Sequence, residues 1–502
     1  MHNPNLHLFA DDHLIGRSAN LERVLNRPRR RAQPVLSADR PWEGGRVQAW
    51  GSVILESDGL LRMWYLGLPN NRPLGWKRIC YCYAESRDGV EWQKPNLGLE
   101  RWHGSLDNNL FYGFGDDDCT KLALRGQGLP ACDRDGRELF VVNNMDGMTV
   151  VRDEDDPDPQ RRYKKFSNMQ DHRMWAWAYP EEYPGVSKEQ WEAAAKTWVQ
   201  CLDTSPDGLH WTKRPTVLIQ ARHGDYMLVA RDQRNRRWWL NQRPPSSHGR
   251  AAGLRYSTDL VTFTDPPEAI FVPDAETGFG RHFEWHGGIT PFNYGDMDFG
   301  FLETWHNAGT GDYCELVCHR DGQPWRRVMP GRPFLDVGSE GAFDRCLAYP
   351  AHNPPIRLGD ELLIFYTGCG PGHRDRQDYS ASIGVMTVRL DRFAGMANAR
   401  QAPGELLTHP LTVTGDMLRI NTEPGIWGQG VRVAVLDESG TVLPGYGLDA
   451  CEPMLSDAVR LPVRWKERSS LAPLRGQRVK LLFEIIGATL YAFAFTPPEE
   501  TR

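Results

Sequence analysis

The sequence predicts an all-β protein, and three observations lead to this prediction. The chain has 49 glycines and 36 prolines, so it is rich in turns. It also carries 18 Trp, 16 Tyr and 19 Phe, and aromatic residues favour strands. Third, one short turn motif recurs through the middle of the chain, each time after a β-rich stretch. Together these features indicate many short strands rather than a helical protein.

Length and charge limit the classes of protein that need to be considered. A chain of 502 residues is too long for one core and sufficient for two or three domains. Its formal net charge of −6 gives no reason to expect a nucleic-acid partner or an anionic membrane. No apolar run approaches the ~20 residues of a membrane span. Asp11 and Asp12 follow the short apolar stretch at the N-terminus, which is unlike a secretory signal, so we expect a cytoplasmic protein.

The recurring motif is Ser/Thr-x-Asp-Gly-x-x-Trp or a degenerate form of it. In such a turn the Asp side chain caps the backbone, the Gly supplies a positive φ and the Trp packs beneath. One copy is weak evidence, but five copies in register indicate a repeated four-stranded unit. The motif aspartates are Asp88, Asp207, Asp259, Asp321 and Asp391. We expect a structural role for the three that belong to Asp-Gly turns, Asp88, Asp207 and Asp321.

A pair of strands precedes each motif, so each unit begins with a hairpin. Units of about 45–70 residues repeated five times predict a five-bladed β-propeller, with a large β-sandwich as the alternative. Each expected first strand should line one channel and open a separate sheet. These strands are expected at residues 46–56, 147–153, 226–232, 287–293 and 345–351.

The pattern changes after the fifth unit. Residues 406–495 contain short strands at regular spacing, which predicts a β-sandwich of roughly 100 residues. The predicted domains are therefore an N-terminal arm (1–40), the propeller that carries the site (41–398) and a C-terminal β-sandwich (399–502). The basic run at 27–31 in the arm is expected to be solvated or to lie between domains.

Carboxylates stand just before every expected first strand, where the chain enters one mouth of the channel. They are Glu43, Asp146, Asp225, Glu284 and Asp344. Carboxylates that converge in a cleft raise one another's pKa, which separates an acid from a base as glycosidic bond cleavage requires. Single members of the set can instead cap turns or pair with arginines, and the set as a whole can hold a structural calcium ion.

Two of these acids are assigned roles. Glu284 lies between two aromatic residues, which suits it to the acid role, and Asp225 is then the base or nucleophile. Glu43 and Asp344 are expected at the rim of the same pocket. Flat aromatic faces and hydrogen-bonding groups for a sugar are expected from Trp42, Trp50, His223, Arg281, Trp285, His286, Trp305, Arg345 and His352.

Several segments resemble the five-bladed propeller glycosidases, which include the invertase/levanase family (glycoside hydrolase family 32) and the arabinanase/xylosidase family (family 43). The segments that carry the resemblance are Pro41-Trp-Glu43, Met63-Trp-Tyr65, the stretch 84–92, the stretch 156–164 and His223-Gly-Asp225. The resemblance implies acids in the first three blades in the order Asp, Asp, Glu. The corresponding positions here are Glu43, Asp146 and Asp225, so Glu284 and Asp344 stay equal contenders.

The leading functional hypothesis is a hydrolase that needs no cofactor and acts on a small glycoside or oligosaccharide, furanosides included. One alternative is a glycoside phosphorylase in which Arg281, His282, Arg345 and His352 hold phosphate. Another is a carbohydrate-binding propeller without catalytic activity. Sugar identity and oligomeric state have no signature in the sequence.

The cysteines generate a first test. The ten cysteines show no CxxC pair and no regular framework, so we expect reduced thiols. The native protein should give the same intact mass with and without reductant. A bridge that the reductant breaks would contradict the expected cytoplasmic location.

Overall fold

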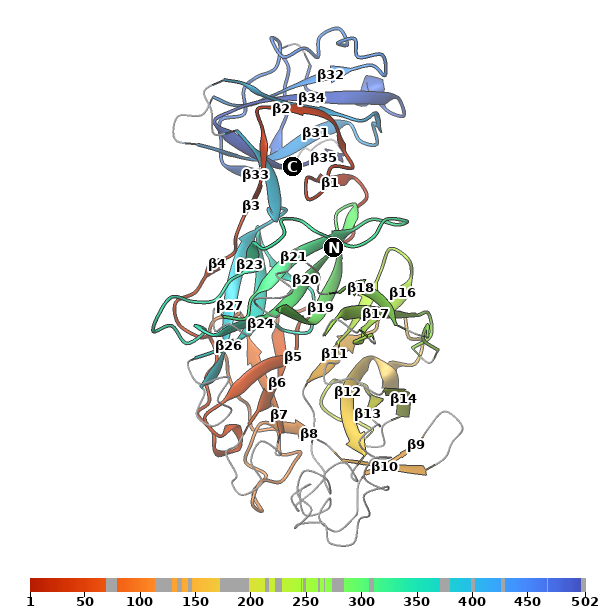
Figure 1. The fold of residues 1–502 in the computed structure, drawn as a ribbon, viewed down its shortest axis with the longest axis vertical. Helices are drawn as coiled ribbons and strands as arrows, with labels where there is room; N and C mark the ends of the chain where they lie inside the picture. Colours follow the sequence, from red (N-terminus) through yellow and green to blue (C-terminus); the bar gives the residue numbers. More distant parts are fainter. Residues whose placement is uncertain are drawn as a thin grey trace.

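The structure is a computed structural model of the chain. It describes residues 1–68, 79–112, 129–132, 138–142, 147–171, 198–212, 216–221, 228–244, 246, 250–260, 262–265, 267–272, 284–306, 311–370, 380–398, 402–425, 429–466 and 468–497. Within these ranges the strands form seven sheets. In Figure 1 five of the sheets make the lower body, and two sheets lie above them.

The five lower sheets follow one another along the chain, and we number them from first to fifth. The first contains β5 (Val47–Leu55), β6 (Leu61–Gly67), β7 (Cys80–Ser86) and β8 (Leu110–Tyr112). The second contains β9 (Leu129–Cys132), β10 (Glu138–Val142), β11 (Met148–Arg152), β12 (Tyr163–Asp171), β13 (Trp198–Ser205) and β14 (Thr216–Ala221). The third contains β15 (Leu228–Asp232), β16 (Arg237–Asn241), β17 (Ala252–Ser257) and β18 (Glu268–Phe271).

The fourth and fifth sheets each have five strands. The fourth contains β19 (Glu284–Tyr294), β20 (Met297–His306), β21 (Cys314–His319), β22 (Arg326–Arg327) and β23 (Pro333–Leu335). The fifth contains β24 (Leu347–Pro350), β25 (Ile356–Leu358), β26 (Glu361–Cys369), β27 (Ala381–Arg389) and β4 (Arg29–Arg30). The strands β5, β11, β15, β19 and β24 overlap the five predicted first strands, and each opens a separate sheet as predicted.

Each of these first strands lies at an edge of its sheet, so one row of its backbone N–H groups lacks a partner in the sheet. Groups of the preceding sheet accept from these donors, and the fifth sheet accepts from the first. The bonds are Val150 N to Ser52 Oγ (2.9 Å), Val229 N to Thr149 Oγ1 (3.3 Å), Ile289 N to Asn241 Oδ1 (3.3 Å), Ala348 N to the Asp312 carbonyl (2.9 Å) and Ala49 N to Thr367 Oγ1 (2.9 Å). The five sheets are thereby joined in a closed ring of contacts.

Apolar side chains fill the space between neighbouring sheets of the ring. Successive residues on a strand point to opposite faces, and β16 shows the consequence. Trp238 packs with Phe166 and Leu202 of the second sheet, whereas Trp239 packs with Ile289 and Leu302 of the fourth. Similar clusters lie between the first and second, fourth and fifth, and fifth and first sheets. Both faces of each sheet are therefore buried.

The motif turns have the predicted geometry. Asp88 Oδ1 accepts from the N–H groups of Val90 and Glu91 at 2.8 and 2.9 Å, and Gly89 has a φ of 76°. Asp207 makes the same pair of bonds, and the carbonyl of Gly208 accepts from Trp64 Nε1 of the first sheet at 2.8 Å. These two aspartates are thus turn residues, as predicted from the sequence.

The two upper sheets contain strands from both ends of the chain. One has β1 (Leu6–Leu8), β3 (Glu22–Leu25), β28 (Ala394–Ala397), β31 (Met417–Pro424), β33 (Ala458–Pro462) and β35 (Ala488–Thr496). The other has β2 (Ile15–Ala19), β29 (Gly404–Thr408), β30 (Leu411–Thr412), β32 (Gly430–Leu436) and β34 (Arg478–Ile486). Figure 1 shows the red N-terminal strands among the blue C-terminal ones. The sequence predicted residues 1–40 only as an arm and did not indicate these pairings.

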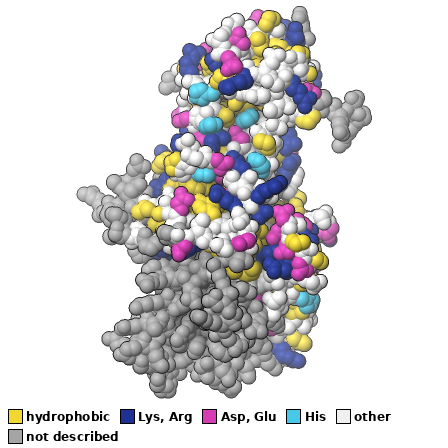
Figure 2. All heavy atoms as spheres, turned by 90° about the vertical axis from the view of Figure 1, so that its right-hand side faces the viewer, with side chains coloured by type: hydrophobic (Ala, Val, Ile, Leu, Met, Phe, Trp, Pro, Cys, Tyr) yellow, Lys and Arg dark blue, Asp and Glu magenta, His cyan; other side chains and the backbone are white. Residues whose placement is uncertain are grey.

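The surface carries charges of both signs. In Figure 2 acidic and basic side chains are interleaved over the described part of the face shown. Ion pairs such as Arg231–Asp155 at 2.7 Å join them. The eight cysteines whose side chains the structure describes are free thiols. Within the described ranges, no helix has the length and the apolar character of a membrane span.

The ring bonds generate a stability prediction at Ser52. Its hydroxyl is fully buried, accepts from Val150 N and donates to the carbonyl of His352, so it joins the first, second and fifth sheets. Ser52→Ala should lower the free energy of unfolding in urea by about 1–3 kcal/mol, because it leaves two buried backbone groups without partners. The exposed-turn variant Ser57→Ala is the control and should change little. Equal stabilities for the two variants would contradict the proposed role of the ring bonds.

Candidate active site

Two buried carboxylates lie at the end of the fourth sheet where its first strand begins. β19 begins at Glu284, whose backbone is paired with His306 at the end of β20, so Glu303 on β20 is close to this end. Asp312 precedes β21 and bridges to Leu347 at the start of β24, with its N–H donating to the Cys346 carbonyl at 2.8 Å. Backbone pairing thus brings both acids to the junction of the fourth and fifth sheets.

Glu303 and Asp312 are each 1% exposed. Both raise the pKa of the same two side chains, Tyr349 and Cys314. Burial raises the pKa of the Tyr349 phenol well above its usual value, and the charges of Asp312 and Glu303 add to this rise. Burial likewise raises the pKa of the Cys314 thiol, again with contributions from both acids. The Tyr349 hydroxyl donates to the Thr304 carbonyl at 2.9 Å, which fixes the ring beside them. Both buried acids therefore influence the same two side chains, Tyr349 and Cys314.

Arginines from two other sheets reach the same region. The Arg250 guanidinium, just before β17, lies 5.0 Å from the centre of the Trp305 ring and lowers the pKa of Tyr349. Arg46, just before β5, is 7% exposed. Burial and then the charge of Asp312 raise the pKa of the Cys369 thiol, and the positive charge of Arg46 opposes this rise. We call Arg46, Arg250, Glu303, Trp305, Asp312 and Tyr349 the mouth cluster. It combines paired acids, compensating cations and an aromatic face, which is a set that glycosyl transfer can use.

The predicted catalytic residues fall into three groups. Asp146 and Asp225 lie outside the described residues, as do His223 and Arg281. Glu284, Trp285 and His286 lie on β19, and only their backbone is described; it pairs with His306, Trp305 and Thr304. This part of β19 is therefore at the same end of the fourth sheet as the mouth cluster. Glu43 and Asp344 are described in full.

Glu43 has partners that leave it no free lone pair. It is fully buried and accepts from Tyr65 Oη at 2.6 Å and from the N–H groups of Asp39 and Arg40 at 2.8 and 3.0 Å. Lys94 Nζ lies 2.7 Å from its Oε1. These bonds anchor the short 3-10 turn η1 (Pro41–Glu43). The geometry argues for a structural carboxylate and against the rim role expected from the sequence.

Asp344 is also held by structural partners. Its Oδ2 accepts from Tyr366 Oη at 2.6 Å and lies 2.9 Å from Arg30 Nε. Tyr366 belongs to β26 and Arg30 to the outermost strand, β4, so this carboxylate lies against the fifth sheet. Burial and the negative charge of Asp344 both raise the pKa of the Tyr366 phenol. These contacts hold Oδ2, whereas the buried Oδ1 has no hydrogen-bond partner. The place of Asp344 at the rim of a pocket stays a prediction.

Among the predicted sugar-binding residues, two meet near the middle of the ring. A methyl group at Gly147, just before β11, would lie 2.9 Å from His352 Cε1 and 3.7 Å from Trp50 Cβ. His352 N–H donates to the Gly51 carbonyl at 2.7 Å, so His352, Trp50 and Gly147 bring the fifth, first and second sheets together. The buried Nε1 of Trp50 has no hydrogen-bond partner.

The other predicted binding residues differ in their surroundings. Trp42 packs with the core between the fifth and first sheets and donates from Nε1 to Asn109 Oδ1 at 2.7 Å, so it is a packing residue. Trp305 belongs to the mouth cluster. Arg345 is partly buried, and its N–H donates to the Ala342 carbonyl at 3.3 Å.

Sequence reasoning missed Arg46, Arg250, Glu303, Asp312 and Tyr349. It searched only for acids just before first strands, whereas Glu303 lies near the end of a second strand and Asp312 precedes a third strand. The signal that was available is the pair of segments Glu303-Thr-Trp305 and Gly311-Asp-Tyr313, where polar and aromatic residues adjoin at strand ends.

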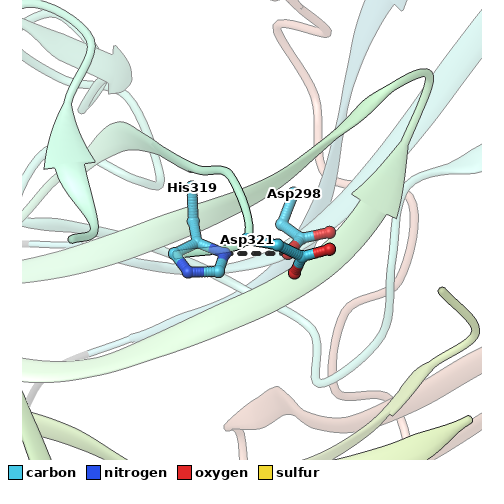
Figure 3. A group of neighbouring side chains, drawn as sticks. All are labelled: Asp298, His319 and Asp321. Atoms are coloured by element: carbon cyan, nitrogen blue, oxygen red, sulfur yellow. Dashed lines mark hydrogen bonds and ion pairs between the residues drawn. The ribbon is translucent and has the colours of Figure 1, made fainter. Parts of the chain in front are cut away.

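A second cluster of ligand-type side chains lies at the other end of the fourth sheet. Figure 3 shows the imidazole of His319 beside the carboxylates of Asp298 and Asp321, and their ligand atoms lie within 4.8 Å of one another. His319 Nδ1 is 2.9 Å from Asp298 Oδ2, and Asn293 Nδ2 donates to Asp298 Oδ1 at 2.7 Å. Arg234 Nε is 3.6 Å from the same carboxylate. These partners account for the buried charge of Asp298 without an ion.

His352 generates a prediction about pH. Its Nδ1 lies 2.7 Å from the Met148 carbonyl, so Nδ1 carries the proton, and burial lowers its pKa to about 4 from the usual 6.5. As the pH falls from about 6.5 to about 4, the unfolded chain binds a proton that the folded chain does not, and up to about 3 kcal/mol of stability is lost. His352→Gln should lose less stability than the wild type between pH 7 and pH 5 in urea unfolding.

The exposed variant His13→Gln is the control for this measurement and should follow the wild type. If His352→Gln also follows the wild type at both pH values, His352 is not held neutral in the folded protein.

Comparisons with known proteins give similarities of structure only. No protein-family model matches the chain, and no curated protein matches it in sequence. Among solved structures it is similar to an N-acetylgalactosamine deacetylase from F. plautii, with 14% identity, 75% of this chain and 97% of that chain covered, and a TM-score of 0.45. It is similar to a β-1,2-mannobiose phosphorylase from Listeria innocua, with 13% identity, 74% and 98% covered, and a TM-score of 0.44. For a thermostable family-43 glycoside hydrolase the values are 13%, 67% and 87%, and 0.39. These names include the hydrolase and phosphorylase classes to which the sequence pointed, but at such identities and TM-scores they assign neither substrate nor reaction to this chain.

Proposed function

We propose that the chain is a five-bladed propeller enzyme that hydrolyses a glycosidic bond in a small glycoside or oligosaccharide. The closed ring of five sheets supports the blade count. The two upper sheets share one apolar core, with Val433 and Phe483 from one sheet and Ile420 and Phe493 from the other, which supports the C-terminal β-sandwich. The proposed domain division keeps the predicted propeller and sandwich, with β1, β2 and β3 of the arm and β28 added to the sandwich and β4 of the arm added to the propeller.

The observation that carries the proposed reaction is the mouth cluster beside the start of β19. Glycoside hydrolysis needs one protonated carboxyl group to protonate the leaving oxygen and one carboxylate to attack the sugar or to activate water. We assign these roles to Glu284 and Asp225. Nearby negative charges raise the pKa of an acid, so Glu303 and Asp312 would keep Glu284 protonated near neutral pH. Arg250 and Arg46 would balance the remaining charge.

The proposal includes the setting in which the enzyme works. We infer a cytoplasmic hydrolase that needs no cofactor, with a carbohydrate substrate and without a nucleic-acid or membrane partner. The net charge of −6 supports the part of this setting that concerns nucleic acid.

A glycoside phosphorylase is the second candidate, and one observation favours it. Arg46 and Arg250 bring two guanidinium groups from different sheets toward the same region, and paired arginines bind phosphate well. Cleavage that requires inorganic phosphate and releases a sugar phosphate would select this candidate over hydrolysis.

The catalytic assignment is tested with p-nitrophenyl glycosides and the matching disaccharides. Glu284→Gln should lower kcat/KM on the disaccharide by about a thousandfold or more and far less on the aryl glycoside, whose leaving group needs little protonation. Asp225→Asn should abolish activity on both substrates. Glu303→Gln should shift the acid-controlled limb of the pH profile to lower pH, because it removes a negative charge near the acid.

Glu340→Gln, at an exposed turn, is the control for the loss of a carboxylate and should behave as the wild type. Near-normal turnover by both Glu284→Gln and Asp225→Asn would refute the assignment. If the wild-type protein binds sugars but does not cleave them, with or without phosphate, the result would favour a carbohydrate-binding propeller without catalytic activity.

A further inference from the structure

Two buried amide side chains in the second sheet have no hydrogen-bond partners. Asn168 on β12 and Gln200 on β13 are directly opposite in the antiparallel pair, and both are 0% exposed. Neither the nitrogen nor the oxygen of either amide is bonded. Leaving a buried polar group unbonded sacrifices its hydrogen bonds to water, so this pair of amides destabilises the folded state.

The pair interrupts an otherwise apolar face. The next pair on the same face is Phe166, two residues before Asn168, and Leu202, two residues after Gln200. Both pack with Val229 and Trp238 of the third sheet. Apolar side chains of similar size at 168 and 200 would continue this packing without unbonded polar atoms. A polar pair that weakens the fold at such a place is typical of a functional site.

The pair is also at the end of the sheet where the first strands start. β11 begins at Met148 opposite Ser167, so the register places Asn168 opposite Gly147. Gly147 is the residue against which His352 and Trp50 lie. Trp50 adds a third unbonded group, the buried Nε1–H of its indole. Three unbonded buried side chains, Trp50, Asn168 and Gln200, therefore belong to the first and second sheets.

The chemistry of the pair indicates the kind of ligand. Each amide offers two N–H donors and a carbonyl acceptor and carries no charge. Neighbouring hydroxyl groups of a sugar both donate and accept, so they can satisfy two facing amides at once. An anion or a cation would find no opposite charge in this pair.

We propose that Asn168 and Gln200 form a subsite that binds hydroxyl groups of a neutral sugar ring. The subsite deepens the proposed glycoside hydrolase function and rests on it for the class of ligand. Because both amides are closed to solvent, a sugar reaches them only after the packing around them rearranges. Ligand binding then supplies the hydrogen bonds that the free protein lacks.

The test measures stability and sugar binding in the same variants of the full chain. The double variant Asn168→Leu, Gln200→Met removes the polar atoms and keeps apolar bulk, and Gln200→Met alone serves if the double variant fails to fold. Ser167→Ala is the matched control, because Ser167 is on the same strand, equally buried and also unbonded, but points to the opposite face. Unfolding in urea gives stability. Calorimetry with glucose, galactose, mannose, arabinose, xylose and fructose, and with their p-nitrophenyl glycosides, gives affinity.

We expect the amide variants to be at least as stable as the wild type and to bind the best sugar about 10- to 100-fold more weakly. Ser167→Ala should bind as the wild type does. Deoxy analogues of the best sugar should include one that binds the wild type weakly and shows no further loss in the double variant.

Each contrary result has a distinct meaning. Unchanged affinity in the amide variants, or a clear loss of stability without loss of affinity, overturns the subsite while hydrolysis by the wild type still supports the proposed function. Amide-dependent binding without cleavage supports the subsite and overturns the hydrolase. If none of the sugars or glycosides binds to the wild type, both proposals fail.

Discussion

The backbone N–H groups on the free edges of the first strands impose the constraint on which the lower body depends. A first strand cannot extend its own sheet further, yet its donors are buried and need acceptors. Ser52, Thr149, Asn241 and Thr367 supply side-chain oxygens from the preceding sheet, and the Asp312 carbonyl does so between the fourth and fifth sheets. These bonds fix how far each sheet is displaced along its neighbour, because a shift by one residue would leave both partners unbonded.

The candidate site follows from the same constraint. The Asp312 carbonyl that accepts from Ala348 belongs to the residue whose carboxylate joins Glu303 beside Tyr349. One backbone bond therefore closes the ring and also places an acid at the junction of two sheets. The apolar clusters between sheets exclude water from this junction, and a low dielectric strengthens every charge interaction within it.

Some buried polar side chains of this protein have hydrogen-bond or ion-pair partners, and others have none. Lys165 and Asp203 are both fully buried, lie 2.7 Å apart and are covered by Tyr112, whose hydroxyl also donates to Asp203. Breaking such a pair leaves an uncompensated charge, so it stabilises the contact between the first and second sheets only as a unit. Asn168, three residues further along the same strand, is equally buried and has no bond. The bonded pair Lys165–Asp203 is therefore structural, whereas the unbonded Asn168 belongs to the proposed sugar subsite.

The sequence by itself determined the features that depend on local chemistry. Alternating apolar residues set the strands and their two faces, and the Asp-Gly turns at Asp88 and Asp207 close hairpins through bonds that span only a few residues. Only the tertiary structure decided what each carboxylate does. Glu43 and Asp344 precede first strands as predicted, but each is paired with a cation distant in sequence, Lys94 and Arg30. Backbone pairing across β20, β21 and β24 brings Glu303 and Asp312 to the junction of two sheets. The role of a charged side chain depends on the group that lies opposite it, and that group is set by long-range packing that no local pattern records.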